Sequence, residues 1–129
     1  MTKAAFYATR PEPPPVNNGG ASVTESLIHR LTRHGFETFA PGLSADLEAR
    51  NQIGIETYGD ELRFDNGRDS LIDWYQEALD SSKYGDLSVG VYDGNEPTSD
   101  FEWEVYHIYL AQLGITARLK RLLQKRYEE

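Results

Sequence analysis

The pattern of apolar and polar positions predicts a chain built from amphipathic helices, and the clearest of them runs from Asp69 to Asp80. A helix repeats about every 3.6 residues, so positions three and four apart share one face. The apolar positions on one stripe are Leu71, Ile72, Tyr75, Ala78 and Leu79. The polar positions on roughly the opposite side are Asp69, Asp73, Gln76, Glu77 and Asp80. This helix therefore has a core face and an acidic face.

Signals for the start of this helix lie just before it. Asn66 is a suitable N-cap, and it leaves Asp69 in the first turn, where a carboxylate interacts favourably with the helix dipole. Arg68 then lies at the mouth of the helix, placed to meet either Asp65 or an anionic ligand. Gly85 is expected to end the helix.

Two helices are predicted upstream. The first is capped by Ser22 or Thr24 and ends at Gly35. The second follows an N-cap at Ser44 and covers residues 45–58. Its residues Arg50, Gly54 and Tyr58 recur every four positions and share one edge. A glycine inside a helix is unfavourable, so we expect another helix or a ligand to approach closely at residue 54.

A last helix is predicted from about Phe101 to Arg126, with Ser99 or Asp100 as its cap and Gly114 as a place to bend or break. The preceding residues 86–100 indicate a loop, within which residues 87–92 form at most a short strand. The positions available for a core stripe are Phe101, Val105, Ile108, Tyr109, Leu113, Leu119 and Leu122.

The fold class that follows is all-α: one four-helix bundle-like domain over residues 23–129, with a long loop before the last helix. A chain of 129 residues is long enough for one domain with its own core. Residues 1–22 are rich in proline and glycine and are expected to form an extended, flexible arm. The alternative is an arm that packs across a neighbouring subunit.

The net charge of −8 disfavours binding to nucleic acid, whose phosphates attract cationic surfaces. Cysteine is absent, so any metal must be held by oxygen or histidine. An acidic protein that binds a phosphorylated ligand needs a cation to screen its carboxylates, which makes Mg²⁺ or Mn²⁺ the natural cofactor. No apolar run is long enough to span a bilayer and no signal pattern begins the chain, so we expect a soluble, cytoplasmic protein without a membrane partner.

The acidic face offers a candidate metal site. Glu77 and Asp80 are three residues apart, and Asp73 lies one turn before Glu77. On the last helix Glu104 and His107 repeat the same step, so two acidic helices facing one another would form a metal cluster. The alternative is that these carboxylates form the hydrated side of a surface helix.

Other catalytic chemistries find little support. The chain has no cysteine nucleophile, no Gly-x-Ser-x-Gly elbow and no glycine-rich phosphate loop after a strand. Metal-assisted attack of water on a phosphoanhydride is the reaction that the available residues serve best.

Residues 46–59, 66–69 and 73–80 together resemble phage-type MazG-like proteins, with the resemblance covering about residues 44–84. These proteins belong to the all-α nucleoside triphosphate pyrophosphohydrolase superfamily. Its members use Glu-Glu-x-x-Glu, a spacer and then Glu-x-x-Asp to hold magnesium on a triphosphate. They release a nucleoside monophosphate and pyrophosphate, usually as dimers or tetramers.

By this resemblance, Gln76-Glu77-x-x-Asp80 matches the first motif and Glu104-x-x-His107 the second. The resemblance implies that Glu77, Asp80 and Glu104 are metal ligands, and that Asp73 is a further ligand or a base. The residues it implies for holding phosphate and base are Arg50, Tyr58, Asn66 and Arg68. Gln76 and His107 each replace an anionic side chain of the pattern, which weakens magnesium binding.

The expected function is metal-dependent hydrolysis of (deoxy)nucleoside triphosphates to monophosphate and pyrophosphate by a homo-oligomer. One alternative is a phage protein that binds or sequesters a nucleotide with little or no turnover. A second alternative is a structural interaction module whose proline-rich arm contacts a partner.

Overall fold

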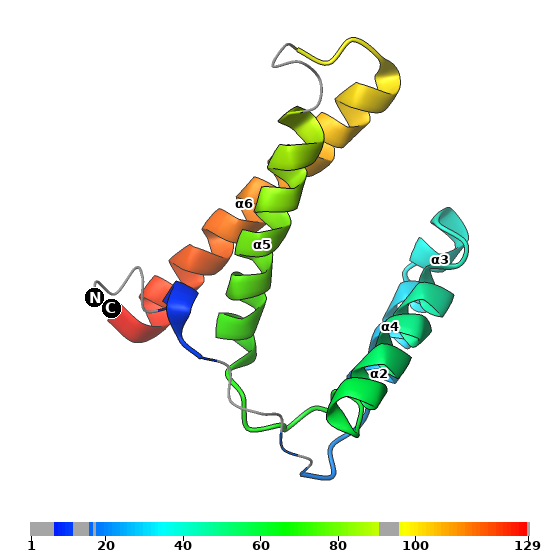
Figure 1. The fold of residues 1–129 in the computed structure, drawn as a ribbon, viewed down its shortest axis with the longest axis vertical. Coiled ribbons are helices and arrows are strands. Elements are labelled where there is room, and N and C mark those ends of the chain that lie inside the picture. The colour runs from blue at the N-terminus through cyan, green and yellow to red at the C-terminus, as the bar shows by residue number, and fades with distance from the viewer. Residues whose placement is uncertain (1–6, 12–15, 17, 91–95, 129) are drawn as a thin grey trace. The chain divides into compact units, whose positions relative to one another are not determined.

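The computed structural model describes residues 7–11, 16, 18–90 and 96–128, and it confirms an all-α protein (Figure 1). The chain forms two compact units. The hairpin unit contains residues 1–12 and 69–129, and the loop-and-helix unit contains residues 13–68. Each unit has its own packing and is described separately.

This division differs from the expected arm over residues 1–22 and single domain over residues 23–129. The units divide between Arg68 and Asp69, at the end of a non-helical stretch in which Gly59, Asp65 and Gly67 have positive φ and interrupt helical structure. The bundle of four helices stays a prediction. The expected loop residues 93–95 and the prolines 13–15 of the arm lie outside the described residues.

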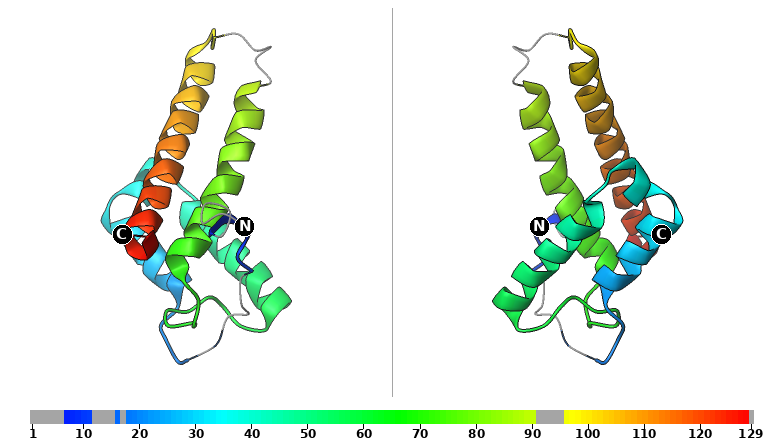
Figure 2. Two further views of the ribbon diagram at one scale, coloured as in Figure 1. Left: turned by 90° about the vertical axis from the view of Figure 1, so that its left-hand side faces the viewer. Right: turned by 90° about the vertical axis from the view of Figure 1, so that its right-hand side faces the viewer.

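The hairpin unit is built from α5 (Ser70–Gly90) and α6 (Asp100–Glu128), which run side by side in opposite directions (Figures 1 and 2). The predicted apolar stripe of α5 is confirmed, since Ile72, Tyr75 and Ala78 are buried and Leu71 and Leu79 pack against them. The prediction of which α6 residues form the core stripe is only partly confirmed. Leu119 is buried, but Leu122 is 50% exposed and Leu123 is fully buried in its place.

Gly85 does not end α5, and the loop predicted to begin at residue 86 is wrong for residues 86–90, which are helical. The glycine serves packing, because a Cβ at this position would lie 2.8 Å from Cδ1 of Tyr109. The Tyr109 hydroxyl also donates to Asp86 Oδ1 at 2.9 Å, which fixes the level at which α5 and α6 meet. On α6, the predicted cap is confirmed by the Glu102 amide, which donates to Ser99 Oγ at 3.1 Å.

The N-cap of α5 is Asp69 and not Asn66. The amides of Leu71 and Ile72 donate to Asp69 Oδ1 at 3.1 and 3.3 Å. Asn66 instead accepts from the Arg68 amide at 3.0 Å and closes a local turn. The positive φ of Gly67 explains the difference, because a residue in that conformation cannot occupy the first helical turn.

Part of the expected flexible arm is packed onto the chain's own helices. Tyr7 is 2% exposed and belongs to the core of the hairpin unit. Its ring lies 4.7 Å from Lys120 Nζ, and its hydroxyl donates to Glu128 Oε2 at 3.3 Å. The aromatic ring makes the difference, because burying it stabilises the segment around residue 7. The segment around Tyr7 is therefore packed, while the flexible arm over residues 1–22 as a whole stays a prediction.

The loop-and-helix unit contains α2 (Val23–Arg33), α3 (Phe36–Phe39) and α4 (Leu43–Tyr58). The predicted cap of α2 is confirmed, since the Glu25 amide donates to Ser22 Oγ at 3.2 Å. The one-turn helix α3 lies between the two predicted upstream helices and is not among the helices that the sequence predicts. Ser44 is inside α4 and does not cap it, because α4 begins at Leu43.

Glu37 of α3 supplies the cap that α4 lacks locally. Its carboxylate accepts from the amides of Gly42 at 3.1 Å and Ser44 at 2.8 Å. These backbone hydrogen bonds, led by that of Ser44, lower the pKa of Glu37. The short helix α3 is thereby tied to the start of α4.

Candidate functional site

Two of the predicted metal ligands share a hollow on the hairpin unit, named here the hairpin hollow. Its volume is about 530 Å³, and one of its walls is formed by Ala8 and Thr9 of the amino-terminal segment. The side chains that matter for its chemistry are Arg10, Gln76, Glu77, Asp80 and Lys83. Both carboxylates and two cations therefore face the same space.

Helical spacing explains why the α5 residues meet here. Glu77 and Asp80 are one turn apart on α5, and Lys83 follows Asp80 by one further turn. Gln76 anchors the opposite wall, because its side-chain amide donates to the carbonyl oxygens of Tyr7 at 3.1 Å and Arg10 at 2.8 Å. The amino-terminal segment is thus held beside the carboxylates.

One ion pair within the hollow, between Lys83 and Asp80, is weak. Lys83 Nζ lies 3.7 Å from Asp80 Oδ1, with the two side chains 78% and 61% exposed. An ion pair this exposed contributes little, because water screens it. The Asp80 carboxylate and the Lys83 ammonium can therefore exchange this contact for a ligand at low cost.

The two carboxylates suit a hard cation. Mg²⁺ is usually bound through one or two carboxylates together with waters and phosphate oxygens, and Glu77 and Asp80 provide that number. Within the described ranges, no group of three or more histidine or acidic side chains converges on a common point. Asp73 lies one turn before Glu77 on α5 and does not line the hollow.

The structure does not bring Glu104 to these carboxylates. The Ser82 and Thr116 hydroxyls are hydrogen-bonded to each other, and Asp86 accepts from the Tyr109 hydroxyl. Because α5 and α6 run in opposite directions, these contacts place Glu77 beside about residue 118 of α6. Glu104 is 14 residues from that level, which along a helix is about 20 Å. His107 lies on the same distant half of α6, where its ring contacts Trp103 at 5.9 Å between centroids.

A second hollow, named here the loop hollow, collects two of the predicted substrate-binding residues in the loop-and-helix unit. It has a volume of about 370 Å³ and is lined by Tyr58 and Asn66 together with Asp60, Glu61 and Arg63. Tyr58 is 72% exposed, so its ring is open to solvent. The other two predicted residues, Arg50 of α4 and Arg68, do not line this hollow.

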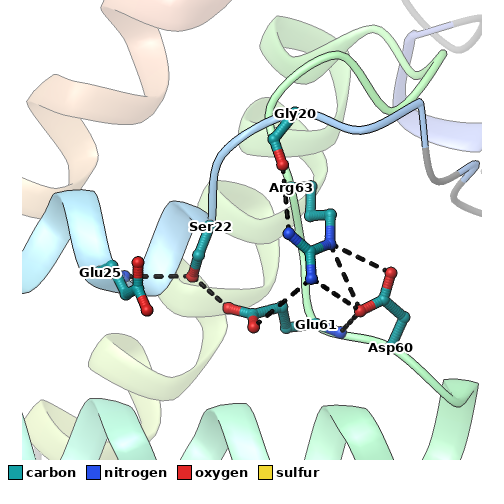
Figure 3. A network of polar contacts seen from close by, with 6 residues as sticks. All are labelled: Gly20, Ser22, Glu25, Asp60, Glu61 and Arg63. Carbon is teal, nitrogen blue, oxygen red and sulfur yellow. Dashed lines mark hydrogen bonds and ion pairs between the residues drawn. The ribbon is translucent and has the colours of Figure 1, made fainter.

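Arg63 is the centre of a polar network beside the loop hollow (Figure 3). Its Nε lies 3.2 Å from Asp60 Oδ2 and its Nη1 donates to the Gly20 carbonyl at 3.2 Å. Glu61 extends the network, because it accepts from Ser22 and lies 3.8 Å from Arg63 Nη2. The hydrogen bond to Asp60 is the main reason that the pKa of Arg63 is raised. This arginine joins residues 20–22 to residues 60–63.

Sequence reasoning missed Arg10, Lys83 and Arg63 as residues of these hollows. Lys83 follows Asp80 by three residues, and that i, i+3 step was a usable signal. Arg10 and Arg63 gave none, because their positions depend on how a non-helical segment folds back onto a helix.

No helix within the described parts of the chain is long and apolar enough to cross a bilayer. No protein-family model, curated protein or solved structure matches this chain.

Proposed function

We propose that the hairpin hollow binds a nucleoside triphosphate together with Mg²⁺ or Mn²⁺, and that the protein hydrolyses it to a monophosphate and pyrophosphate. The observation that carries this proposal is the meeting of two carboxylates and two cations in one open space of about 530 Å³. A triphosphate with its metal presents both charges, because the oxygens are anionic and the ion is cationic.

Each side chain has a role that its charge supports. Glu77 and Asp80 hold the metal, and Arg10 and Lys83 bind phosphate oxygens. When bound, the metal supplies Lewis acidity at a phosphate and a more acidic water. Gln76 positions the wall that carries Arg10 through its two hydrogen bonds to the amino-terminal segment. Asp73 stays the predicted additional ligand or base.

The experiment is a measurement of pyrophosphate release from the common ribo- and deoxyribonucleoside triphosphates, with Mg²⁺ or Mn²⁺ and with EDTA. Glu77→Gln and Asp80→Asn should each lower kcat/KM by about a hundredfold or more, because the metal contributes several kcal/mol to the transition state. Glu48→Gln is the matched control, since Glu48 is an exposed carboxylate of α4 outside both hollows. Absence of pyrophosphate with every nucleotide and either metal would exclude the hydrolase.

Nucleotide binding without turnover is a second candidate function, and the position of Glu104 favours it. With Glu104 about 20 Å along the helix, two carboxylates of this chain serve the metal where the resemblance implies three. Calorimetry that shows metal-dependent binding of a triphosphate, without pyrophosphate release, would support this candidate. Failure of every nucleotide to bind would exclude both candidates.

A further inference from the structure

The face of α6 turned away from α5 carries a regular seam of residues. They are Trp103, His107, Leu110, Gly114, Ala117 and Arg121, with alternating steps of four and three residues. This is the spacing by which one helix packs along another in a coiled coil. All six residues are exposed, including Trp103 at 39% and Leu110 at 45%. The opposite face of α6 is the one that packs on α5, through Thr116, Leu119 and Leu123.

Gly114 has no packing role among the described residues of the hairpin unit. It lies in the interior of the 29-residue helix α6, where glycine is unfavourable relative to alanine. A Cβ at this position would meet no atom within 4 Å. Its neighbour on the seam, Ala117, is also small. A surface helix that keeps glycine at an open position allows another backbone or side chain to approach there.

The seam is complementary to itself when it is reversed. Its amino-terminal half carries the large side chains Trp103, His107 and Leu110, and its carboxyl-terminal half carries Gly114, Ala117 and Arg121. In an antiparallel pair of α6 helices, Leu110 lies opposite Gly114 of the second copy. His107 lies opposite Ala117, and Trp103 lies opposite Arg121, whose guanidinium can stack on the indole.

The charges along α6 are also complementary when reversed. The amino-terminal part of the helix carries Asp100, Glu102 and Glu104, while the carboxyl-terminal part carries Arg118, Arg121, Lys125 and Arg126. A parallel pair would place like charges together, whereas an antiparallel pair places acids beside bases. Glu104 and Arg118 flank the seam on the same side. In the antiparallel pair, Glu104 of each copy would therefore face Arg118 of the other copy.

We propose that α6 docks against α6 of a second copy of this chain, antiparallel, about a twofold axis midway between Leu110 and Gly114. The interface is isologous, so every contact occurs twice. Glu104 is then an ion-pairing residue of the interface, which agrees with its separation from Glu77 and Asp80 on the same unit. The proposal does not depend on nucleotide binding.

The test is the mass of the full chain in solution, by light scattering or sedimentation equilibrium, over a range of concentrations. The chain mass is 14.6 kDa, and the wild type should reach about twice that value. Glu104→Arg and Arg118→Glu should each weaken dimerisation by about tenfold or more, since each creates two like-charge contacts. The double variant should regain the wild-type dissociation constant. Glu48→Arg on α4 makes the same change of charge elsewhere and should leave the constant unchanged.

Gly114→Leu is the second variant. The new leucine side chain would occupy the space that Leu110 of the second copy fills in the proposed dimer. The variant should therefore be monomeric, while its far-ultraviolet circular dichroism spectrum stays that of a helical protein. The helix itself tolerates the change, because the site is open. Two results would overturn the proposal: a wild-type mass of 14.6 kDa at every concentration, or a dimer unaffected by Gly114→Leu and by both charge reversals.

Discussion

Gln76 donates its side-chain amide to the carbonyl oxygens of Tyr7 and Arg10, at 3.1 and 2.8 Å. This relationship explains why a glutamine stands where the resemblance calls for a glutamate. A carboxylate accepts hydrogen bonds and cannot donate to two carbonyls. Gln76, the residue at which the chain departs from the resembled motif, is therefore the residue that holds the amino-terminal wall of the hairpin hollow.

Gln76→Glu should destabilise the protein by about 1–3 kcal/mol, because the partly buried carbonyl oxygen of Tyr7 and the exposed one of Arg10 lose their donor and face a negative charge. Chemical denaturation at neutral pH measures the change. Gln76→Met is the control for the lost donor without added charge, and it should cost less. Unchanged stability together with tighter magnesium binding in Gln76→Glu would contradict the positioning role.

Asp69 gives a prediction of pH dependence. Burial opposes its charge, but the Tyr127 hydroxyl, the amides of Ile72 and Leu71 and the Arg126 guanidinium together lower its pKa. A carboxyl whose folded pKa is depressed adds stability above its unfolded pKa of about 3.9, and this stability is lost as pH falls through the lower folded pKa.

Unfolding free energy should therefore decline below about pH 4 in the wild type. The decline should be smaller in Asp69→Asn, which keeps a capping oxygen without the charge. Asp69→Ala should cost about 1 kcal/mol at neutral pH through loss of the cap. Denaturant titrations between pH 2.5 and 7 measure all three chains. Equal pH dependence in wild type and Asp69→Asn would show that other carboxyls dominate.

The helices were predictable from the sequence because their signals are local. The stripe of Ile72, Tyr75 and Ala78, the cap at Ser22 and the cap at Ser99 each depend on residues within a turn or two. The extension of α5 past Gly85 was missed, since the reason for that glycine is the ring of Tyr109 on another helix. The pattern of residues within one helix does not indicate contacts with a second helix.

The candidate site was predictable only where one helix supplies it. Glu77 and Asp80 share the hairpin hollow because helical spacing places them there. Glu104 was assigned by motif, and its level along α6 depends on a register that the sequence does not show. The burial of Tyr7 was not predicted, because the proline and glycine content of residues 1–22 indicates an extended arm. A single buried aromatic ring is nevertheless enough to pack such a segment against a helix.

Two glycine substitutions in the loop-and-helix unit should have opposite effects. At Gly20, a Cβ would lie 1.9 Å from the Phe64 carbonyl oxygen, so Gly20→Ala must displace the backbone. We expect a loss of about 2 kcal/mol or more, comparable with other strained sites. At Gly54, a Cβ would meet nothing within 4 Å, so Gly54→Ala should add about 0.5–1 kcal/mol through helix propensity.

Thermal and denaturant unfolding of the two alanine variants give this comparison directly. The pair serves as its own control, because the same methyl group is added within the same unit. If Gly20→Ala were neutral, residues 20–22 would not be held against residues 62–64 as the hydrogen bond from the Phe64 amide to the Ala21 carbonyl indicates. A destabilised Gly54→Ala would contradict the open space around residue 54.

Tyr58 tests whether the loop hollow takes part in nucleotide recognition. Its ring is 72% exposed beside Asn66, and an open aromatic ring can stack on a base, which is worth about 1–3 kcal/mol. Tyr58→Ala should therefore raise the dissociation constant for a triphosphate by about tenfold or more, while Tyr58→Phe, which keeps the stacking surface, should not. Calorimetry in the presence of Mg²⁺ measures both, and Tyr84→Ala is the matched control because Tyr84 is 70% exposed on α5. Equal affinity in Tyr58→Ala and wild type would exclude the loop hollow as a place where the nucleotide base stacks.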